Sequence, residues 1–433
     1  MSELTRRIFG IPRAWLVVSS GALFYCYQFI LRVAPNVLKD DWEKFFSLDA
    51  SEFGQLVSLY SWSYAAVQLP LGVMLDRFGA GRIIVVASTI CALSCFLFAT
   101  SNSIYMAGIA MFFMGLGSAA GFLGSIKLGT TWFPPSQLAK VVALTLLFGT
   151  IGASIGGTPL SAMATQYGWQ TAIIALGFVG LTISLLIFMA VGRHGEPHTY
   201  EPADDLFHGM MQVLRQPQAW LIATYGMLMY APVTIMGTAW GVPFVKSVYS
   251  IPETIAATLT TALFIGAAVG SPVFALYSDR IQKRLPPMMV GVVLSSIVNG
   301  IVIFIPNISL MGMYILFFAI GFCYTAKSLS FTSICEIMPP SCSGVAVGFL
   351  NTITMATGAL FHPLIGNLLD YHSDGTIIND VKIYSEWDYR FALAIVPICM
   401  VIGVVIVRFI KETHHAHKLT PAEESTAQLG ALE

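Results

Sequence analysis

Three basic residues lie inside long apolar stretches of the sequence: Arg32, Lys127 and Lys327. A charged side chain at the centre of a bilayer costs about 2.5–3.5 kcal/mol on insertion scales, so it is expected to face a cavity or a partner. Glu336 and Asp370 fall at the ends of such stretches, and neither is expected near the membrane midplane. A bound anion is the natural partner, because arginine holds a planar acid group through two hydrogen bonds and lysine supplies a point charge.

The stretches that hold these cations are long enough to cross a membrane. Of the 433 residues, 56% are hydrophobic and 10% are charged, against roughly 25% charged in a soluble domain. A helix needs about 20 apolar residues to cross the hydrocarbon core, and continuous apolar runs argue against alternating strands. We predict an all-α membrane protein whose twelve transmembrane helices occupy residues 14–36, 53–75, 82–101, 104–131, 139–163, 169–191, 219–246, 254–278, 287–305, 309–336, 344–369 and 390–410.

The positions of Lys and Arg predict the orientation of these helices. Basic residues are enriched in the loops on the side of the N-terminus, which places both termini in the cytoplasm and favours a bacterial inner membrane. The longest polar stretch divides the spans six and six. The expected units are a bundle over residues 1–191, a cytoplasmic linker over 192–218, a second bundle over 219–411 and a disordered cytoplasmic tail over 412–433.

The two halves of the sequence echo each other. An Asp-Arg pair follows the second span at Asp76 and the eighth span at Asp279, and proline pairs end the fourth and tenth spans at 134–135 and 339–340. Pro159 and Pro363 differ by nearly the same offset. These anchors predict a duplicated six-helix unit forming two pseudo-symmetric bundles, an arrangement that places a substrate site near the membrane midplane between the halves.

The segment Gly72-x-x-x-Asp76-Arg77-x-Gly79-x-x-Arg82 resembles the loop after the second helix of the major facilitator superfamily. The resemblance implies the major facilitator fold and transport by alternating access. From the residues themselves, we expect Gly72 to let two helices approach closely and Asp76 to accept hydrogen bonds from amides at a helix end. The predicted gating motif comprises Gly72, Asp76, Arg77, Gly79, Arg82 and the weaker copy Asp279 and Arg280.

Within that family, the first and fourth spans resemble organic-anion carriers of the anion:cation symporter kind. Those carriers have an Asp-Arg pair in the first helix and a basic residue five positions before a Trp-Phe-Pro in the fourth. Arg32 and Lys127, which lies five positions before Trp132, match the basic positions, whereas Leu31 stands where the acid would be. The resemblance therefore implies a small organic anion as the substrate without implying the same proton coupling.

Polar and aromatic residues repeat at helical spacing beside the cations. The alternative reading is that these residues join helices by hydrogen bonds without any ligand. Lys127 could instead extend to the membrane surface, and Arg32 could pair with an acid such as Asp40. The predicted substrate-binding residues are Arg32, Lys327, Lys127, Tyr25, Gln28, Tyr64, Gln68, Tyr324 and Asn351.

One histidine of the sequence, His362, falls within a predicted span, directly before Pro363. The ordinary pKa of histidine, about 6.5, suits a proton relay, so His362 is a candidate coupling residue. A neutral histidine bonded to a neighbouring hydroxyl is the alternative.

We predict a secondary transporter that moves a small anionic, carboxylate-bearing organic solute by alternating access. It is expected to act as a monomer in the lipid bilayer, with protons or a counter-anion as the open choices for a coupled solute. A facilitator of amino acids or short peptides, a drug or metabolite efflux carrier, and a transporter-like receptor or accessory subunit are the alternatives. The net charge of −1 does not indicate a surface that binds nucleic acid. The sequence shows no nucleophile–base pair, metal-spaced cluster or cofactor motif that would indicate an enzyme.

Overall fold

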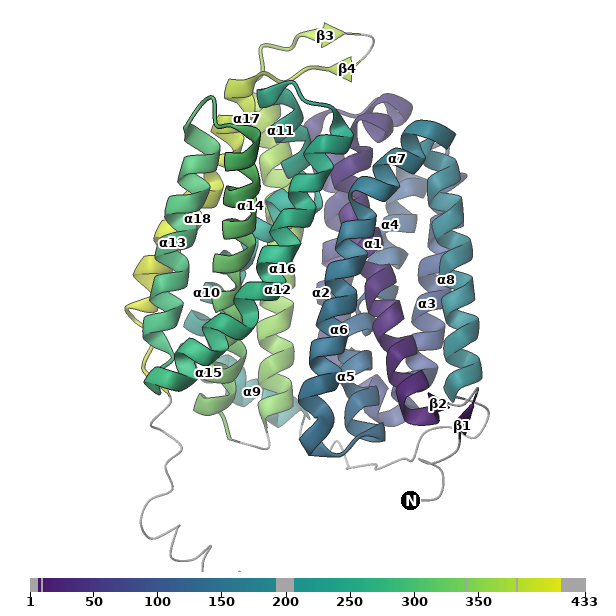
Figure 1. The fold of residues 1–433 in the computed structure, drawn as a ribbon, viewed down its shortest axis with the longest axis vertical. Coiled ribbons are helices and arrows are strands. Elements are labelled where there is room, and N and C mark those ends of the chain that lie inside the picture. Colours follow the sequence, from purple (N-terminus) through teal and green to yellow (C-terminus); the bar gives the residue numbers. More distant parts are fainter. Residues whose placement is uncertain (1–6, 9–10, 192–205, 340–341, 379–380, 414–433) are drawn as a thin grey trace, which may run out of the picture.

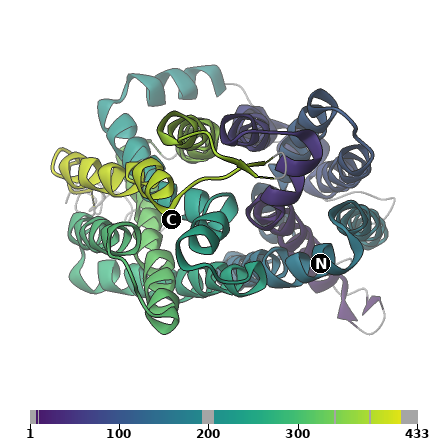
Figure 2. The same ribbon diagram turned by 90° about the horizontal axis from the view of Figure 1, so that it is seen from above.

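The computed structural model describes residues 7–8, 11–191, 206–339, 342–378 and 381–413. Helices of the first and second halves of the chain form two groups that lie side by side (Figures 1 and 2). The first group contains α1 (Arg13–Phe46), α2 (Ala50–Phe78), α3 (Ala80–Ala99), α4 (Ile104–Ser118), α5 (Ala120–Trp132), α6 (Pro135–Gly156), α7 (Thr158–Tyr167) and α8 (Trp169–Val191).

The second group follows the short helix α9 (Leu206–Arg215). It contains α10 (Pro217–Thr238), α11 (Gly241–Tyr249), α12 (Glu253–Ile281), α13 (Leu285–Phe304), α14 (Leu310–Tyr324), the 3-10 turn η1 (Thr325–Lys327), α15 (Ser328–Ile337), α16 (Ser343–His372), α17 (Glu386–Leu393) and α18 (Ile395–Val407). Two small antiparallel hairpins complete the described chain, formed by β1 (Arg7–Ile8) with β2 (Ile11–Pro12) and by β3 (Ile377–Ile378) with β4 (Val381–Lys382).

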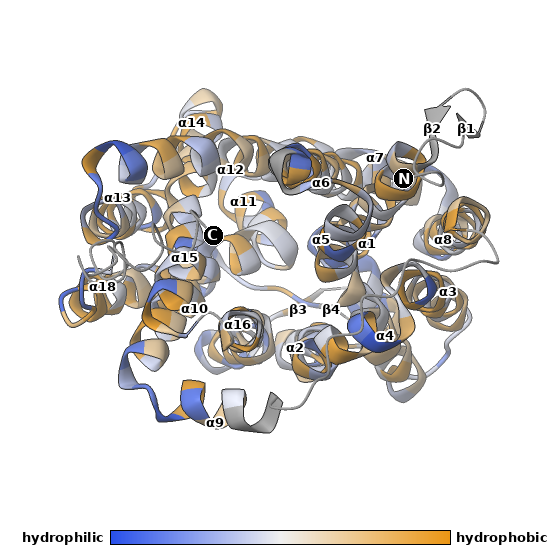
Figure 3. Ribbon diagram, turned by 90° about the horizontal axis from the view of Figure 1, so that it is seen from below, coloured by the Kyte–Doolittle hydropathy of each residue, from blue (hydrophilic) through white to orange (hydrophobic). Residues whose placement is uncertain are grey.

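The prediction of an all-α membrane fold is confirmed. Eleven segments of the described chain are long and apolar enough to cross a membrane, and α2, with 29 residues, is the twelfth crossing helix. It is more polar than the others because it carries Tyr60, Tyr64 and Gln68, all of which are buried in the protein interior. Hydrophobic residues run along the peripheral helices (Figure 3), as expected for surfaces that face lipid.

The two groups repeat each other in local structure as well as in sequence. Ser103 caps the N-terminus of α4 and Ser309, 206 positions later, caps α14, and both helices have 15 residues. Each of these membrane crossings then changes geometry in the protein interior, at Ala119 between α4 and α5 and at η1 between α14 and α15. Lys327 is the last residue of η1, so this tightened turn sets the position of one of the predicted cations.

Two opposite ends of the molecule are used below as landmarks (Figure 1). The hairpin end carries β3, β4, α7, α11 and α17. The motif end carries α9 and the turns between α2 and α3 and between α12 and α13. The seam between the two groups is lined by α2 against α16, α6 against α12, and α1 against α10 and α11.

Three element limits differ from the sequence expectations. Helix α1 continues ten residues past the predicted end at residue 36, so Lys39 and Glu43 lie on a helix and not in a loop. The predicted linker contains α9, whose Gln212 accepts a hydrogen bond from Cys342 Sγ at 3.0 Å. The first two residues of the predicted disordered tail are also bonded, because Glu412 accepts hydrogen bonds from the amides of Arg284 and Leu285, at the start of α13, and Thr413 donates to Glu336. Residues 414–433 lie outside the described part of the chain.

Candidate functional site

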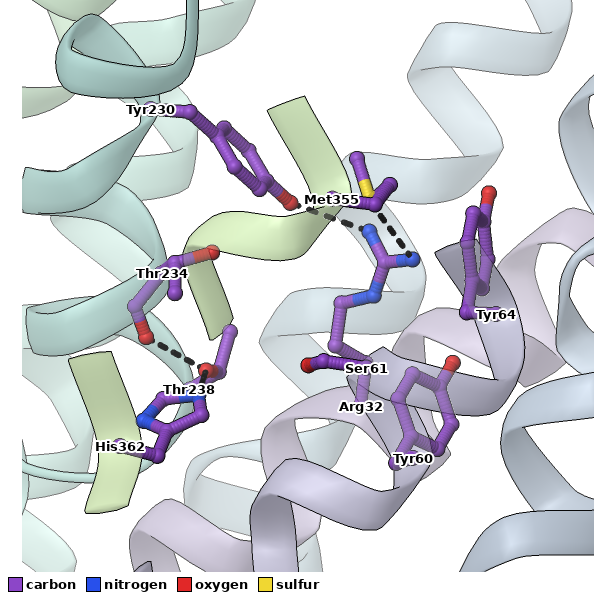
Figure 4. Close-up of a pocket in the computed structure, with 9 residues that line it drawn as sticks. All are labelled: Arg32, Tyr60, Ser61, Tyr64, Tyr230, Thr234, Thr238, Met355 and His362. Carbon is purple, nitrogen blue, oxygen red and sulfur yellow. Dashed lines mark hydrogen bonds between the residues drawn. The ribbon is translucent and has the colours of Figure 1, made fainter. Parts of the chain in front are cut away.

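Arg32 projects from the middle of α1 into the seam between the two groups of helices (Figure 4). Its Nη1 donates a hydrogen bond to Tyr230 Oη at 3.1 Å, and its Nη2 lies 3.7 Å from Met355 Sδ. The guanidinium also lies over the Tyr64 ring, 4.8 Å from the ring centre, and 5.2 Å from that of Phe29. All of these partners are electrically neutral, and a thioether is a weak acceptor, so the charge of Arg32 is held without being neutralised.

Lys327 reaches the same seam from the second group of helices. Its Nζ lies 4.2 Å from the centre of the Tyr230 ring, 5.6 Å from that of Phe331 and 6.0 Å from that of Tyr324. Aromatic faces attract cations weakly through the ring quadrupole. Tyr230 therefore touches both cations, Arg32 through its hydroxyl and Lys327 through its ring.

Neither Arg32 nor Lys327 has an ion-pair partner among the residues that the structure describes. Both side chains are partly exposed, whereas Tyr60, Tyr64 and Tyr230 beside them are buried. Charged groups within a membrane-spanning segment are expected to line a cavity or meet a partner. A cavity is present next to Arg32.

Lys127 does not join the other two cations. Its Nζ lies 2.5 Å from Asp76 Oδ1 at the motif end, and the two side chains are 40% and 56% exposed. The Asp76 carboxylate is therefore the partner of Lys127, where the sequence predicted a bound substrate. Sequence spacing could not reveal this pair, because Asp76 ends α2 and Lys127 lies on α5.

Two adjoining cavities lie at the centre of the seam, and each has room for about one water molecule, about 20 Å³. His362 and Arg32 contribute to the walls of both. His362 Nε2 lies 3.5 Å from Thr238 Oγ1 (Figure 4), whereas His362 Nδ1 is buried without a hydrogen-bond partner in the structure. The first cavity is lined by Arg32, Tyr60, Ser61, Tyr64, Tyr230, Thr234, Thr238, Met355 and His362.

Three of the other predicted binding residues, Gln28, Gln68 and Asn351, form hydrogen bonds between helices. Asn351 Nδ2 donates to Gln68 Oε1 at 2.7 Å across the seam, and Gln68 Nε2 donates to the carbonyl of Ala119 at 3.3 Å. Tyr60 Oη donates to Gln28 Oε1 at 3.3 Å, which leaves Gln28 Nε2 buried without a partner in the structure.

Two predicted tyrosines take different positions. Tyr25 packs against the rings of Phe29 and Phe122 and is not among the residues that line the two cavities. Tyr324 lies 6.2 Å from Tyr230, measured between ring centres, and so borders the Lys327 environment. Tyr64 lines the first cavity.

Tyr230 is the most informative residue that the sequence reasoning missed. The sequence did contain a signal for it, because the offset of 205 between the two proline pairs also separates Tyr25 from Tyr230. The repeat therefore points to Tyr230 as the counterpart of a residue already selected. Tyr60, Thr238 and Met355 also line the cavity. Tyr60 lies four positions before Tyr64 and Met355 four positions after Asn351, so helical spacing pointed to both, whereas Thr238 has no feature in the sequence that distinguishes it from ordinary core residues.

The hairpin end of the seam is closed by hydrogen bonds between the two groups of helices. Asn36 Nδ2 donates to the carbonyl of Met236 at 3.2 Å, and Asn36 Oδ1 accepts from the amide of Val242 at 3.0 Å. The amide of Ser51 donates to Asp370 at 2.7 Å. From Gln68–Asn351 to the motif end, the described residues show no further hydrogen bond or ion pair across the seam. Hydrogen bonds between the two groups of helices are thus concentrated at the hairpin end in the part of the chain that the structure describes.

An ion pair between Lys246 and Asp40 adds to this closure, and Lys246 also lies 3.3 Å from Glu253. Partial burial pulls the pKa of Lys246 down, but the neighbouring Asp40 and Glu253 carboxylates outweigh burial and leave the pKa above its ordinary value. Lys246 therefore keeps its charge, and the pair persists at physiological pH.

The gating motif shows one strict backbone requirement and one difference from expectation. Gly79 has a φ of 85°, a conformation that L side chains rarely adopt, and its amide donates to the carbonyl of Leu75 as α2 ends. A Cβ on Gly72 would meet no atom within 4 Å, so the expected close approach of two helices does not occur here. The neighbouring helices leave open space beside Gly72 in this conformation.

The remaining members of the motif lie on the surface or form local pairs. Arg77 lies 5.6 Å from the centre of the Phe78 ring, and Arg82 and Arg280 are exposed. In the second copy, Arg284 binds Asp279 at 3.1 Å and Glu336 at 2.9 Å. Asp279 and Asp76 thus both pair with a base of their own group of helices.

This fold and these motifs agree with comparisons to known proteins. The family model described as Major Facilitator Superfamily matches residues 16–241 and 222–432, so the chain belongs to this superfamily. The family expected from the sequence is therefore confirmed.

Three relatives illustrate the range of similar proteins. The chain is 28% identical over 174 residues to the uncharacterized transporter YybO of Bacillus subtilis (strain 168), covering 40% of each chain. It is 23% identical over 287 residues to the probable sulfoacetate transporter SauU of Cupriavidus necator, covering 62% of this chain and 66% of the relative. It is 25% identical over 181 residues to the hexuronate transporter of Bacillus subtilis, covering 42% of each chain. Each match spans less than two thirds of the relative's own length.

Solved structures show the same fold. A bacterial homolog of the human lysosomal transporter Spinster, in an inward-facing and unoccupied conformation, superposes with a TM-score of 0.76 at 15% identity, covering 95% of this chain and 99% of that one. The nucleoside transporter NupG superposes with a TM-score of 0.72 at 13% identity, covering 92% and 99%. At these identities the likeness extends to the fold alone.

Proposed function

We propose that this protein is a secondary transporter of a small, carboxylate-bearing organic anion. The observation that carries the proposal is the meeting of Arg32 and Lys327 from opposite groups of helices at one tyrosine, with no carboxylate of the described chain to neutralise them. An anion that enters the seam supplies the missing negative charge. The names of relatives, a probable sulfoacetate transporter and a hexuronate transporter, support the same class of cargo.

Transport follows from alternate opening of the seam around this site. The hairpin end is held by Asn36, Ser51 and Lys246, while the motif end lacks comparable bonds in the described residues. An anion bound between Arg32 and Lys327 would draw the two groups together at the centre and allow the hairpin end to release. Such motion is typical of carriers built from two repeats.

The orientation and the coupled solute belong to the same proposal. We place the motif end and both termini in the cytoplasm of a bacterial inner membrane, with the protein acting as a monomer and not as an enzyme. His362 is the candidate coupling residue, because it lines both cavities beside Arg32 and its Nδ1 lacks a partner in the structure. Proton symport and exchange against a second anion are the two modes to be separated.

Counterflow in proteoliposomes tests this function. Liposomes loaded with an unlabelled organic acid are diluted into the labelled acid, using glucuronate and sulfoacetate as first probes and a wider set of carboxylates after them. We expect uptake by the wild-type protein and by Lys44→Gln, an exposed position at the hairpin end of α1, and loss of uptake in Arg32→Gln and Lys327→Gln. Undiminished uptake by Arg32→Gln and by Lys327→Gln would overturn the proposal.

A further inference from the structure

Tyr230 joins the two cations in an arrangement that bears on the number of charges carried by the cargo. Arg32 Nη1 lies 3.1 Å from the Tyr230 hydroxyl oxygen, and Lys327 Nζ lies 4.2 Å from the centre of the same ring. The two positive groups therefore contact the same side chain, one at its hydroxyl and the other at its ring. They also come from different halves of the molecule, Arg32 from α1 and Lys327 from η1.

Among the residues that the structure describes, the groups in contact with each cation are neutral. The Arg32 guanidinium also lies 3.7 Å from Met355 Sδ, and aromatic rings lie beside both cations. An anion with one charge could neutralise Arg32 or Lys327 but would leave the other unpaired inside the protein. Leaving one charge of such a site unpaired is costly. An anion with two charges neutralises both.

Resting on the proposed function, we propose that the cargo is a compact dianion with two acidic groups at the ends of a short chain. A carboxylate takes the Arg32 position, where the planar guanidinium can form two parallel hydrogen bonds and the Tyr230 hydroxyl is displaced. The second acidic group meets Lys327. Because an ammonium is a point charge without a planar preference, this second group is a carboxylate or a sulfonate.

The size of the cavities gives Tyr230 a role in this binding. The first cavity, which Tyr230 lines, has room for about one water molecule and is too small for an organic acid. Tyr230 must therefore move when the cargo enters. Its hydroxyl occupies the position of the first acidic group and its ring covers the position of the second. In the conformation described here, Tyr230 thus acts as a neutral substitute for both ends of the dianion.

Matched pairs of acids test the inference by thermal stabilisation of the purified full-length protein. The pairs are succinate with its monoamide succinamate, glucarate with gluconate, and sulfoacetate with acetate, compared at pH about 7, where the acids are ionised, and at equal ionic strength. We expect the dianion of at least one pair to reach half-maximal stabilisation at about tenfold lower concentration than its monoanion. In Lys327→Gln this ratio should fall to about one, because the monoanion still binds at Arg32.

Further variants keep the test decisive if Lys327→Gln folds poorly. Lys327→Arg retains the charge and should keep the preference for the dianion, whereas Arg32→Gln should weaken the dianion and the monoanion alike. Equal potency of dianion and monoanion in the wild-type protein would overturn the inference and leave the anion transporter standing. Stabilisation by none of the six acids, together with absence of counterflow of a wider set of carboxylates, would overturn both.

Discussion

The ammonium of Lys39 lies 2.7 Å from Glu43 Oε2, and both side chains are only 3% exposed. Three aromatic rings surround this ammonium, Phe53 from the first group of helices and Trp240 and Tyr384 from the second. The pair therefore sits on the seam at the hairpin end. Burying two charges requires their desolvation, which the attraction between them offsets only when the geometry is good.

Removing the charge of one member of this pair should reduce the stability of the fold far more than removing both charges. We expect Glu43→Gln to lower the free energy of unfolding by about 3–5 kcal/mol, because the charge of Lys39 remains buried, and the double change Lys39→Met with Glu43→Leu to be close to neutral. Unfolding midpoints of the purified variants in detergent measure this. Asp41→Asn, exposed on the same helix, is the control and should change stability by less than about 0.5 kcal/mol. Equal effects of Glu43→Gln and the control would contradict the prediction.

Substitutions of Lys127 and Arg32 should affect anion binding differently. Lys127 is engaged by Asp76 at an exposed position, so Lys127→Gln should leave the affinity of a stabilising anion within about twofold. Arg32→Gln should weaken it by about 100-fold or more, since a hydrogen bond to a charged group contributes about 1.5–3 kcal/mol and a counter-charge is lost as well. Titration of the thermal shift with the anion gives both values. A comparable loss in both variants would place Lys127 at the binding site.

The two glycines of the gating motif should respond in opposite directions to the same substitution. Gly79→Ala should destabilise the protein by about 1–3 kcal/mol, because its backbone conformation is sparsely populated for L residues. Gly72→Ala should stabilise the observed conformation by up to about 1 kcal/mol, since it lies within a helix with free space around it.

Transport rates add the second half of this test. If the seam closes at the motif end during transport, the methyl group of Gly72→Ala should slow counterflow although the protein is more stable. A faster or unchanged rate would show that Gly72 is not approached in any state of the cycle.

The Lys246 pair should show a characteristic dependence on pH. The pKa of Lys246 is raised above its ordinary value of 10.5 by Asp40 and Glu253, against the effect of burial. Its stabilising contribution is thus complete below that ordinary value and is lost as pH rises through the higher pKa of the folded protein. Melting temperatures of the wild-type protein and Lys246→Gln should differ by a constant amount from pH about 7 to about 10 and converge above it. A difference that shrinks between pH about 7 and about 9 would contradict this assignment.

Much of the fold could be predicted because lipid imposes continuous apolar segments on the sequence. The extension of α1 was missed because the segment after Asn36 carries five charged residues within six positions, which resembles a loop. Helical periodicity was nevertheless present, since Leu38 and Trp42 are buried four positions apart while Asp41 and Lys44 are exposed. The length of an apolar run alone cannot distinguish an amphipathic helix end from a polar loop.

The candidate site was predictable only in part. Arg32 and Lys327 stood out because charge within an apolar segment is unusual, whatever its surroundings. The partner of Lys127 depended on how α2 and α5 meet, and the role of Tyr230 depended on two cations arriving from different halves. Such relations arise from packing between helices, which the periodicity of a single helix does not encode.

The cramped chamber beside Arg32 has a consequence for measured affinity. A solute can enter only those molecules whose chamber has widened, so its apparent dissociation constant is the intrinsic one divided by the fraction of molecules in that widened form. Any change elsewhere in the protein that raises this fraction will lower the apparent dissociation constant without altering a contact to the solute. Differences in apparent affinity between solutes, measured on one and the same protein, are free of this factor.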